Sequence, residues 1–172
     1  MQWRSSRLSR SSRLLVAALA GGAQLVLGAL GSPALTAEPG RFALVASPEV
    51  PVTGVSLDEV TRLFSFHKKF WKPGEPASVL LPASGLEART FLLKKIYNLS
   101  EAELRQMILK KLYQGEIDLP PKVASSDRDA LSFVASARGL VTIVPADSVR
   151  GTSVKVLRVD GKLPSEPGYV LK

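Results

Sequence analysis

Cysteine is absent from the 172 residues of this chain. Its absence excludes disulfides, thiolate metal sites, thiol nucleophiles and the attachment of a lipid through cysteine that anchors bacterial lipoproteins. Histidine occurs once, as His67, without a His-x-x-x-His or His-Glu-x-x-His pattern, so we expect no metal site. There is no Gly-x-Ser-x-Gly sequence, and no Ser/His/Asp or paired-carboxylate arrangement stands out. We therefore expect no enzymatic activity and no cofactor.

Acidic residues are missing from residues 1–37, where four arginines lie in a serine-rich start. An apolar stretch follows at residues 14–30, and small residues lead up to Ala37. This order is typical of a secretory signal peptide, so we predict a signal at residues 1–37, cleaved after Ala34 or Ala37, and a periplasmic or secreted protein. The alternative is an uncleaved membrane anchor, but the stretch is interrupted by glycines and is shorter than the about 20 apolar residues a spanning helix needs.

Half of the net positive charge of the chain lies in its predicted signal peptide. The whole chain has 23 basic and 15 acidic residues, and removal of four arginines leaves 19 against 15, a net charge of +4. This modest excess does not indicate a nucleic-acid partner. The segment Phe66–Lys72 does interleave cations with aromatic rings, as single-strand binders do. Outside the cytoplasm, we expect instead that Phe66 and Trp71 anchor this loop on the core while its lysines stay solvated.

Residues 38–172 predict one α/β domain, because strand-like and helix-like segments alternate. Capping boxes predict helix starts at Ser56 and Ser100, Ser126 caps a further helix, and residues 68–76 are expected to form a loop. The expected strands are 41–46, 77–81, a short one from Val123, 140–144, 154–159 and 169–171. The expected helices are 57–64, 86–97, 101–115 and 127–137.

Two segments carry a resemblance to a known family. The first is Ser56–Phe64, followed by a basic stretch to Trp71, Gly74 and a hydrophobic strand. The second is Pro120–Ser125, followed by a helix, Phe133-Val134 and a glycine before an apolar strand. In order and spacing these segments resemble the phosphate-type substrate-binding proteins of ABC transporters (PstS-like), over about residues 42–159.

The resemblance implies a type-2 periplasmic-binding-protein fold, here as a single lobe with a mixed central sheet flanked by helices. It implies a solute-binding-like protein that takes phosphate or another small anion for ABC-type uptake or sensing. The transporter-coupled relatives hold their ligand between two lobes, so a second copy, a membrane transporter or a sensor protein is an expected partner. The alternative is a periplasmic interaction or regulatory module that has lost solute binding.

The predicted anion site is the helix start at Ser84, Gly85 and Leu86, with Arg89 one turn on. Unpaired backbone N–H groups at a helix start favour an anion, glycine lets a ligand approach the backbone, and arginine adds a charged donor. The family's phosphate-binding turn falls at this point, and Ser84 and Gly85 match it. Two observations speak against this anion site. Ser84 could simply be the N-cap of the helix, and Glu87 in the first turn disfavours a bound anion.

Overall fold

A computed structural model of the chain describes residues 41–172, and the predicted signal peptide lies outside the described residues. The strands are β1 (Phe42–Ala46), β2 (Gly54–Val55), β3 (Phe70–Lys72), β4 (Glu75–Pro76), β5 (Ser78–Pro82), β6 (Lys122–Ala124), β7 (Leu140–Pro145), β8 (Lys155–Val156) and β9 (Arg158–Val159). The helices are α1 (Leu57–Phe64), α2 (Glu87–Phe91), the π-helix η1 (Leu92–Tyr97), α3 (Glu101–Tyr113), α4 (Asp127–Ser136) and the 3₁₀ turn η2 (Ala146–Val149). Within these residues, no helix has the length and apolar character needed to cross a membrane.

The main sheet has five strands in the order β6-β5-β7-β1-β8. Strand β5 runs parallel to both β6 and β7, whereas β1 runs antiparallel to β7 and β8. Two small sheets, β2 with β9 and β3 with β4, lie beside it. The predicted mixed sheet flanked by helices is therefore confirmed.

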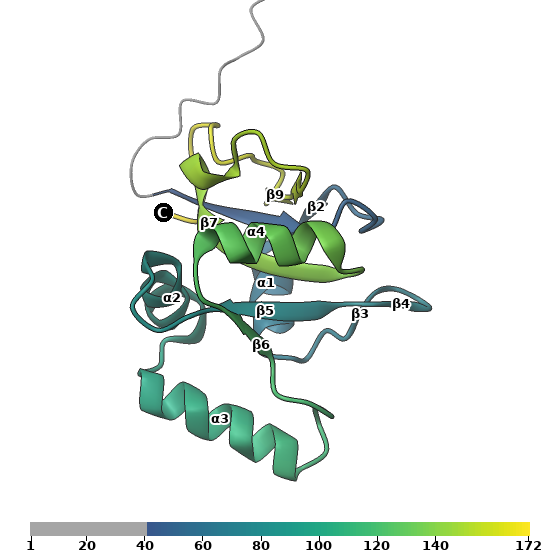
Figure 1. Cartoon of the computed structure of the whole chain (residues 1–172), viewed down its shortest axis with the longest axis vertical. Coiled ribbons are helices and arrows are strands. Elements are labelled where there is room, and N and C mark those ends of the chain that lie inside the picture. Colours follow the sequence, from purple (N-terminus) through teal and green to yellow (C-terminus); the bar gives the residue numbers. More distant parts are fainter. Residues whose placement is uncertain (1–40) are drawn as a thin grey trace, which may run out of the picture. The chain divides into compact units, whose positions relative to one another are not determined.

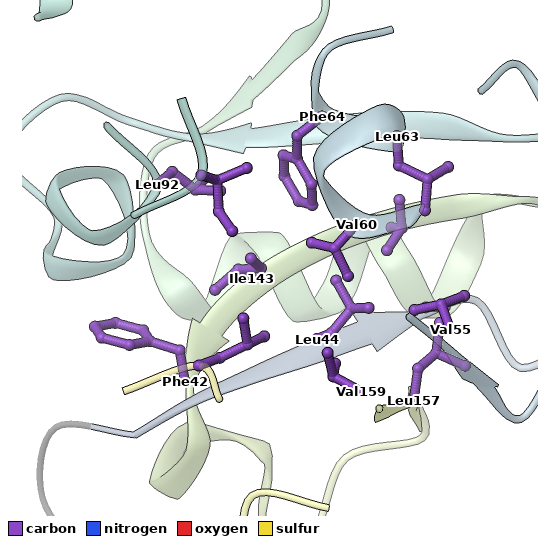
Figure 2. Packing of buried hydrophobic residues seen from close by; sticks show 14 of the residues in the cluster. Phe42, Leu44, Val55, Val60, Leu63, Phe64, Leu92, Ile143, Leu157 and Val159 are labelled. Atoms are coloured by element: carbon purple, nitrogen blue, oxygen red, sulfur yellow. The ribbon is translucent and has the colours of Figure 1, made fainter. Parts of the chain in front are cut away.

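Helices cover both faces of this sheet, so the domain has three layers (Figure 1). Alternate residues of β1 point to opposite faces: Ala43 and Val45 pack in the cluster formed with α4, while Phe42 and Leu44 pack in the cluster formed with α1 and α2. Figure 2 shows the second, larger cluster, in which Leu44 and Ile143 from the sheet meet the apolar side of α1 and Leu92 of η1. All of β1 is buried, as its continuous apolar sequence predicts.

The predicted helix starts are present. The hydroxyl groups of Ser56 and Ser100 each accept a hydrogen bond from the backbone N–H three residues on. The carboxylates of Glu59 and Glu103 accept from the backbone N–H of Ser56 and Ser100, which completes two capping boxes. Ser126 caps α4 by accepting from the N–H of Asp129. These local bonds fix where three helices begin, and the packing of each apolar face then fixes their direction.

Four expectations need correction. Residues 68–76 form the β3–β4 hairpin rather than a loop. Residues 154–159 form two strands in different sheets, because Leu157 is fully buried between β8 and β9. Residues 169–171 are not a strand, although Tyr169 and Leu171 are buried in the core. Finally, the helix predicted over 86–97 changes from α to π at Leu92.

Candidate functional site

The main sheet changes its winding direction beside β5. The chain leaves β5 through α2 on one face to reach the outer strand β6, then leaves β6 through α4 on the other face to reach β7. Because β5, β6 and β7 are parallel, their carboxyl ends share one edge of the sheet, which we call the carboxyl edge. In open α/β sheets, ligands bind at such a switch point, between the loops that follow the two diverging strands. The loop after β5 contains Ser84 and Gly85.

The backbone of this loop is open to a ligand. Gly85 has a φ of +93°, and a Cβ placed there would meet no other atom within 4 Å. The N–H of Leu86 donates to the carbonyl of Ala83 (3.2 Å), whereas no such bond is formed within the described residues by the N–H of Ser84 or of Gly85. Leu86 is the N-cap of α2, and no side chain caps this helix. The interpretation of Ser84 as the N-cap is therefore wrong.

The side chains predicted to hold an anion already hold a carboxylate of the protein itself. Arg89 donates from Nε to Oε1 of Glu101 (2.9 Å) and from Nη2 to Oε2 (2.8 Å), and Ser84 Oγ donates to Oε1 (3.2 Å). Glu101 is the first residue of α3, so this contact also ties α3 to the carboxyl edge. Sequence reasoning missed Glu101, since nothing in its spacing from Arg89 indicates the contact.

The electrostatics of this contact are those of a bound anion. Arg89 is only 9% exposed, so its guanidinium needs an anionic partner. The hydrogen bonds from Arg89, and to a lesser extent that from Ser84, hold the pKa of Glu101 below its usual value. The pair is bidentate, which is the geometry by which arginine binds carboxylates and phosphates. The structure thus brings Ser84 and Arg89 together on the carboxylate of Glu101. Gly85 lies in the same loop, and the N–H of Leu86 is already used by the carbonyl of Ala83.

Other carboxylates lie close by on the carboxyl edge. Glu87 follows β5, Asp127 follows β6 and Asp147 follows β7. Burial raises the pKa of Asp127, and the nearby charges of Asp147 and Glu87 raise it further. A free anion approaching the switch point therefore meets negative charge in addition to the carboxylate of Glu101.

A groove of about 580 Å³ lies between α4 and the segment from Ser148 to Ser153, and Asp127 at the carboxyl edge is part of its lining. Its lining includes Asp127, Arg128 and Thr152, whose hydroxyl group donates to the carbonyl of Val149. Sequence reasoning missed this groove, because a short polar segment after a strand carries no signal of where it folds back.

The aromatic and basic segment behaves as predicted in its anchoring residues. Trp71 is buried and donates from Nε1 to the carbonyl of Gly139 (2.9 Å), and Phe66 packs against the core. Lys68 is not simply solvated, because it pairs with Glu59 and lies 5.8 Å from the centroid of the Trp71 ring.

The single histidine is exposed, and its Nε2 lies 3.3 Å from Nζ of Lys111. No group of three or more side chains that could hold a metal ion occurs in residues 41–172.

No family model matches the chain, and no curated protein matches it in sequence. Solved structures do match in fold. A putative phosphate ABC transporter substrate-binding protein with bound phosphate from Clostridium perfringens has 16% identity and a TM-score of 0.53, over 70% of this chain and 45% of that one. An ABC-type phosphate transport receptor from Vibrio cholerae has 15% identity and a TM-score of 0.57, over 72% and 48%.

PstS from Borrelia burgdorferi has 13% identity and a TM-score of 0.56, over 72% of this chain and 49% of that one. The chain thus spans about half the length of each of these proteins. At such low identity the similarity is one of fold. The predicted resemblance is confirmed at this level: residues 41–172 form a periplasmic-binding-protein-like α/β lobe with the fold of phosphate-type substrate-binding proteins.

Proposed function

We propose that this protein is a periplasmic solute-binding-like protein that recognises phosphate or another small anion with one lobe, for ABC-type uptake or sensing. The observation that supports the proposal most directly is the contact of Ser84 and Arg89 with the carboxylate of Glu101 at the switch point of the sheet. This contact is the geometry in which a free oxyanion would be bound, with Glu101 in its place. The ligand in this proposal displaces Glu101 and takes over its bonds to Arg89.

Displacement sets a condition on affinity. A tethered group competes at an effective concentration of about millimolar or more. Free phosphate must therefore bind Arg89 tightly enough to displace the carboxylate of Glu101. Removal of this carboxylate should reveal the affinity of Ser84 and Arg89 for phosphate without the competitor. Because a Cβ at Gly85 would meet no atom within 4 Å, there is space beside this backbone for an anion that replaces Glu101.

The experiment is a calorimetric titration of phosphate and of sulfate into the exported protein and into three variants. We expect Glu101→Gln to bind phosphate at least about tenfold more tightly than the parent, since the internal competitor is gone. Arg89→Met should abolish binding. Glu103→Gln is the matched control, because Glu103 lies on the same turn of α3 and, within residues 41–172, its carboxylate bonds with Ser100 alone. If the parent protein binds no anion at any concentration tested, the proposal is wrong, whatever Glu101→Gln binds.

A second candidate function is an interaction or regulatory module that has lost solute binding. It is favoured by the same contact considered as part of the fold, because Glu101 neutralises a nearly buried Arg89. Glu87, Asp127 and Asp147 add negative charge to the same edge of the sheet. In this module Glu101 permanently joins α3 to the sheet. The titration separates the two functions, because a module of this kind binds no anion as the parent protein, even when Glu101→Gln does.

A further inference from the structure

The opposite edge of the sheet, where β5, β6 and β7 begin, contains an apolar groove. It has a volume of about 600 Å³ and lies between the β3–β4 hairpin, the segment from Glu116 to Pro121 and the carboxyl end of α4. We call it the amino-edge groove and define it by Phe70, Ser78, Leu119, Lys122 and Phe133, which all line it. None of these residues takes part in the candidate anion site.

Large apolar side chains are left exposed around this groove. Leu119 is 79% exposed, Phe70 is 55% exposed and Phe133 is 44% exposed. A single exposed apolar side chain is ordinary, but several that converge on one concave surface mark a binding surface. The three come from different parts of the chain, namely β3, the segment before β6, and α4. The fold therefore gathers them at one place without using them in its core.

The charge at the rim of the groove is positive. Lys68, Arg138 and Glu116 are already neutralised by ion pairs with residues outside the groove. The exposed Lys69 and Lys122 form no ion pair within the described residues, and Asp118 is the remaining acid of the lining. An apolar floor with free lysines at its rim matches a ligand that carries apolar and acidic groups together.

A free strand edge borders the same groove. β6 is the outermost strand and pairs with β5 alone among the described strands, so its other side has unpaired backbone groups. An extended peptide can add to such an edge through main-chain hydrogen bonds, with alternate side chains entering pockets. Pro120 and Pro121 lack N–H groups, so pairing cannot continue before Lys122. The edge thus offers a short pairing site directly beside the apolar floor.

We propose that the amino-edge groove binds an extended peptide segment of another protein, in which an aromatic or aliphatic side chain enters the groove and neighbouring Asp or Glu side chains pair with Lys69 and Lys122. This inference is independent of anion binding at the carboxyl edge. It gives an interaction module a defined surface and a ligand class.

The test begins with selection of random dodecapeptides on the immobilised exported protein. We expect the selected peptides to share an aromatic or aliphatic residue beside acidic residues, and to bind with micromolar affinity in calorimetry. The double variant Leu119→Ser with Phe133→Ser should weaken binding at least about tenfold. The charge reversals Lys69→Glu with Lys122→Glu should weaken binding as well, and should favour a synthetic peptide in which lysines replace the acidic residues.

Matched controls are Val170→Ser and Lys94→Glu, an exposed apolar residue and an exposed lysine outside the groove, and these should leave binding unchanged. Melting temperatures are measured for all variants. Phe133 and Val170 are 44% and 39% exposed, so serine at either should lower the melting temperature by a few degrees, and Val170→Ser controls for that loss. The inference is overturned if no peptide is enriched, if the enriched peptides are basic, or if they bind the groove variants as tightly as the parent. It is also overturned if light scattering shows a dimer that the groove variants dissociate, since a second copy would then occupy the groove.

Discussion

The two edges of the main sheet use the same kinds of residue in opposite ways. At the carboxyl edge, Arg89 is nearly buried and its charge is satisfied by Glu101. At the amino edge, Lys122 is exposed and has no acidic partner among the described residues, while large apolar side chains stay in solvent. A nearly buried arginine that is paired with a carboxylate stabilises the fold, whereas an exposed apolar surface with unpaired lysines contributes little to stability and remains available to a partner. Paired substitutions at the two edges can test this difference.

The largest contrast is expected between two glycines with positive φ. A Cβ at Gly139, which precedes β7 at the amino edge, would lie 2.1 Å from the carbonyl oxygen of Pro76, whereas a Cβ at Gly85 would meet nothing within 4 Å. Gly139→Ala should therefore lower the free energy of unfolding by more than about 3 kcal/mol. Gly85→Ala should lower it by about 1 kcal/mol, the cost of a left-handed backbone alone. Urea denaturation followed by circular dichroism measures both, and equal losses would contradict the close approach of the two backbones at Gly139.

The next contrast is between two cations. Arg89→Met leaves Glu101 without its two charge-assisted hydrogen bonds, so we expect a loss of about 2 kcal/mol in the free energy of unfolding. Lys122→Met removes the same charge from the exposed rim and should change stability by less than about 0.5 kcal/mol. The same denaturation experiment applies. A Lys122→Met variant that loses as much as Arg89→Met would mean that the rim lysine is structural.

A smaller effect is expected from the acidic residues, and it depends on pH. Because the pKa of Asp127 is raised in the folded protein, its contribution to stability is fully present below the unfolded value of 3.8 and is lost as the pH rises through the folded pKa. Asp127→Asn should therefore raise the melting temperature at pH 7 and have no effect at pH 3. Asp118→Asn, at the amino edge, should change the melting temperature little at either pH. Thermal melting curves recorded between pH 3 and pH 7 test both expectations. A stabilisation by Asp127→Asn that persists at pH 3 would show that the effect does not come from the charge of Asp127.

The smallest effect is expected for Leu119→Ser. The side chain is 79% exposed, so its replacement removes almost no buried apolar area and should change the free energy of unfolding by less than about 0.5 kcal/mol. Urea denaturation again measures the change. A loss above about 1 kcal/mol would show that the groove is part of the core and would weaken its interpretation as a binding surface.

The sequence predicted the parts of the fold that local chemistry determines. The capping boxes at Ser56 and Ser100 and the apolar strand of residues 140–144 carry their own signals, and each is found in the structure. The split of residues 154–159 was missed, although the adjacent apolar residues Val156 and Leu157 already interrupt the alternation in the sequence. The sequence does not show that the two halves join different sheets. The hairpin over residues 68–76 was missed since its short strands carry breakers, and because tertiary contacts such as the bond of Trp71 to a distant carbonyl hold it in place.

The sequence predicted only those residues of the candidate site that lie close together in the chain. Ser84, Gly85 and Arg89 lie close together in the chain, so the sequence could place them together. Glu101 lies beyond the π-helix and the turn that follows it, and its carboxylate reaches Arg89 only because this turn brings the first residue of α3 beside α2. The amino-edge groove could not be predicted from the sequence, since Phe70, Leu119 and Phe133 come together only in the folded chain. Each of them taken alone is typical of an ordinary surface residue.

The hydrogen bond of Trp71 to Gly139 has a practical consequence. Tryptophan occurs twice in the chain, and the other one, Trp3, lies within the predicted signal peptide. In a processed protein, the indole of Trp71 would be the only strong fluorophore. It lies in the β3–β4 hairpin, next to Phe70, and it reports on the carbonyl that links this hairpin to the start of β7. The intrinsic emission of the mature protein should therefore follow events at one edge of the sheet, without any attached dye.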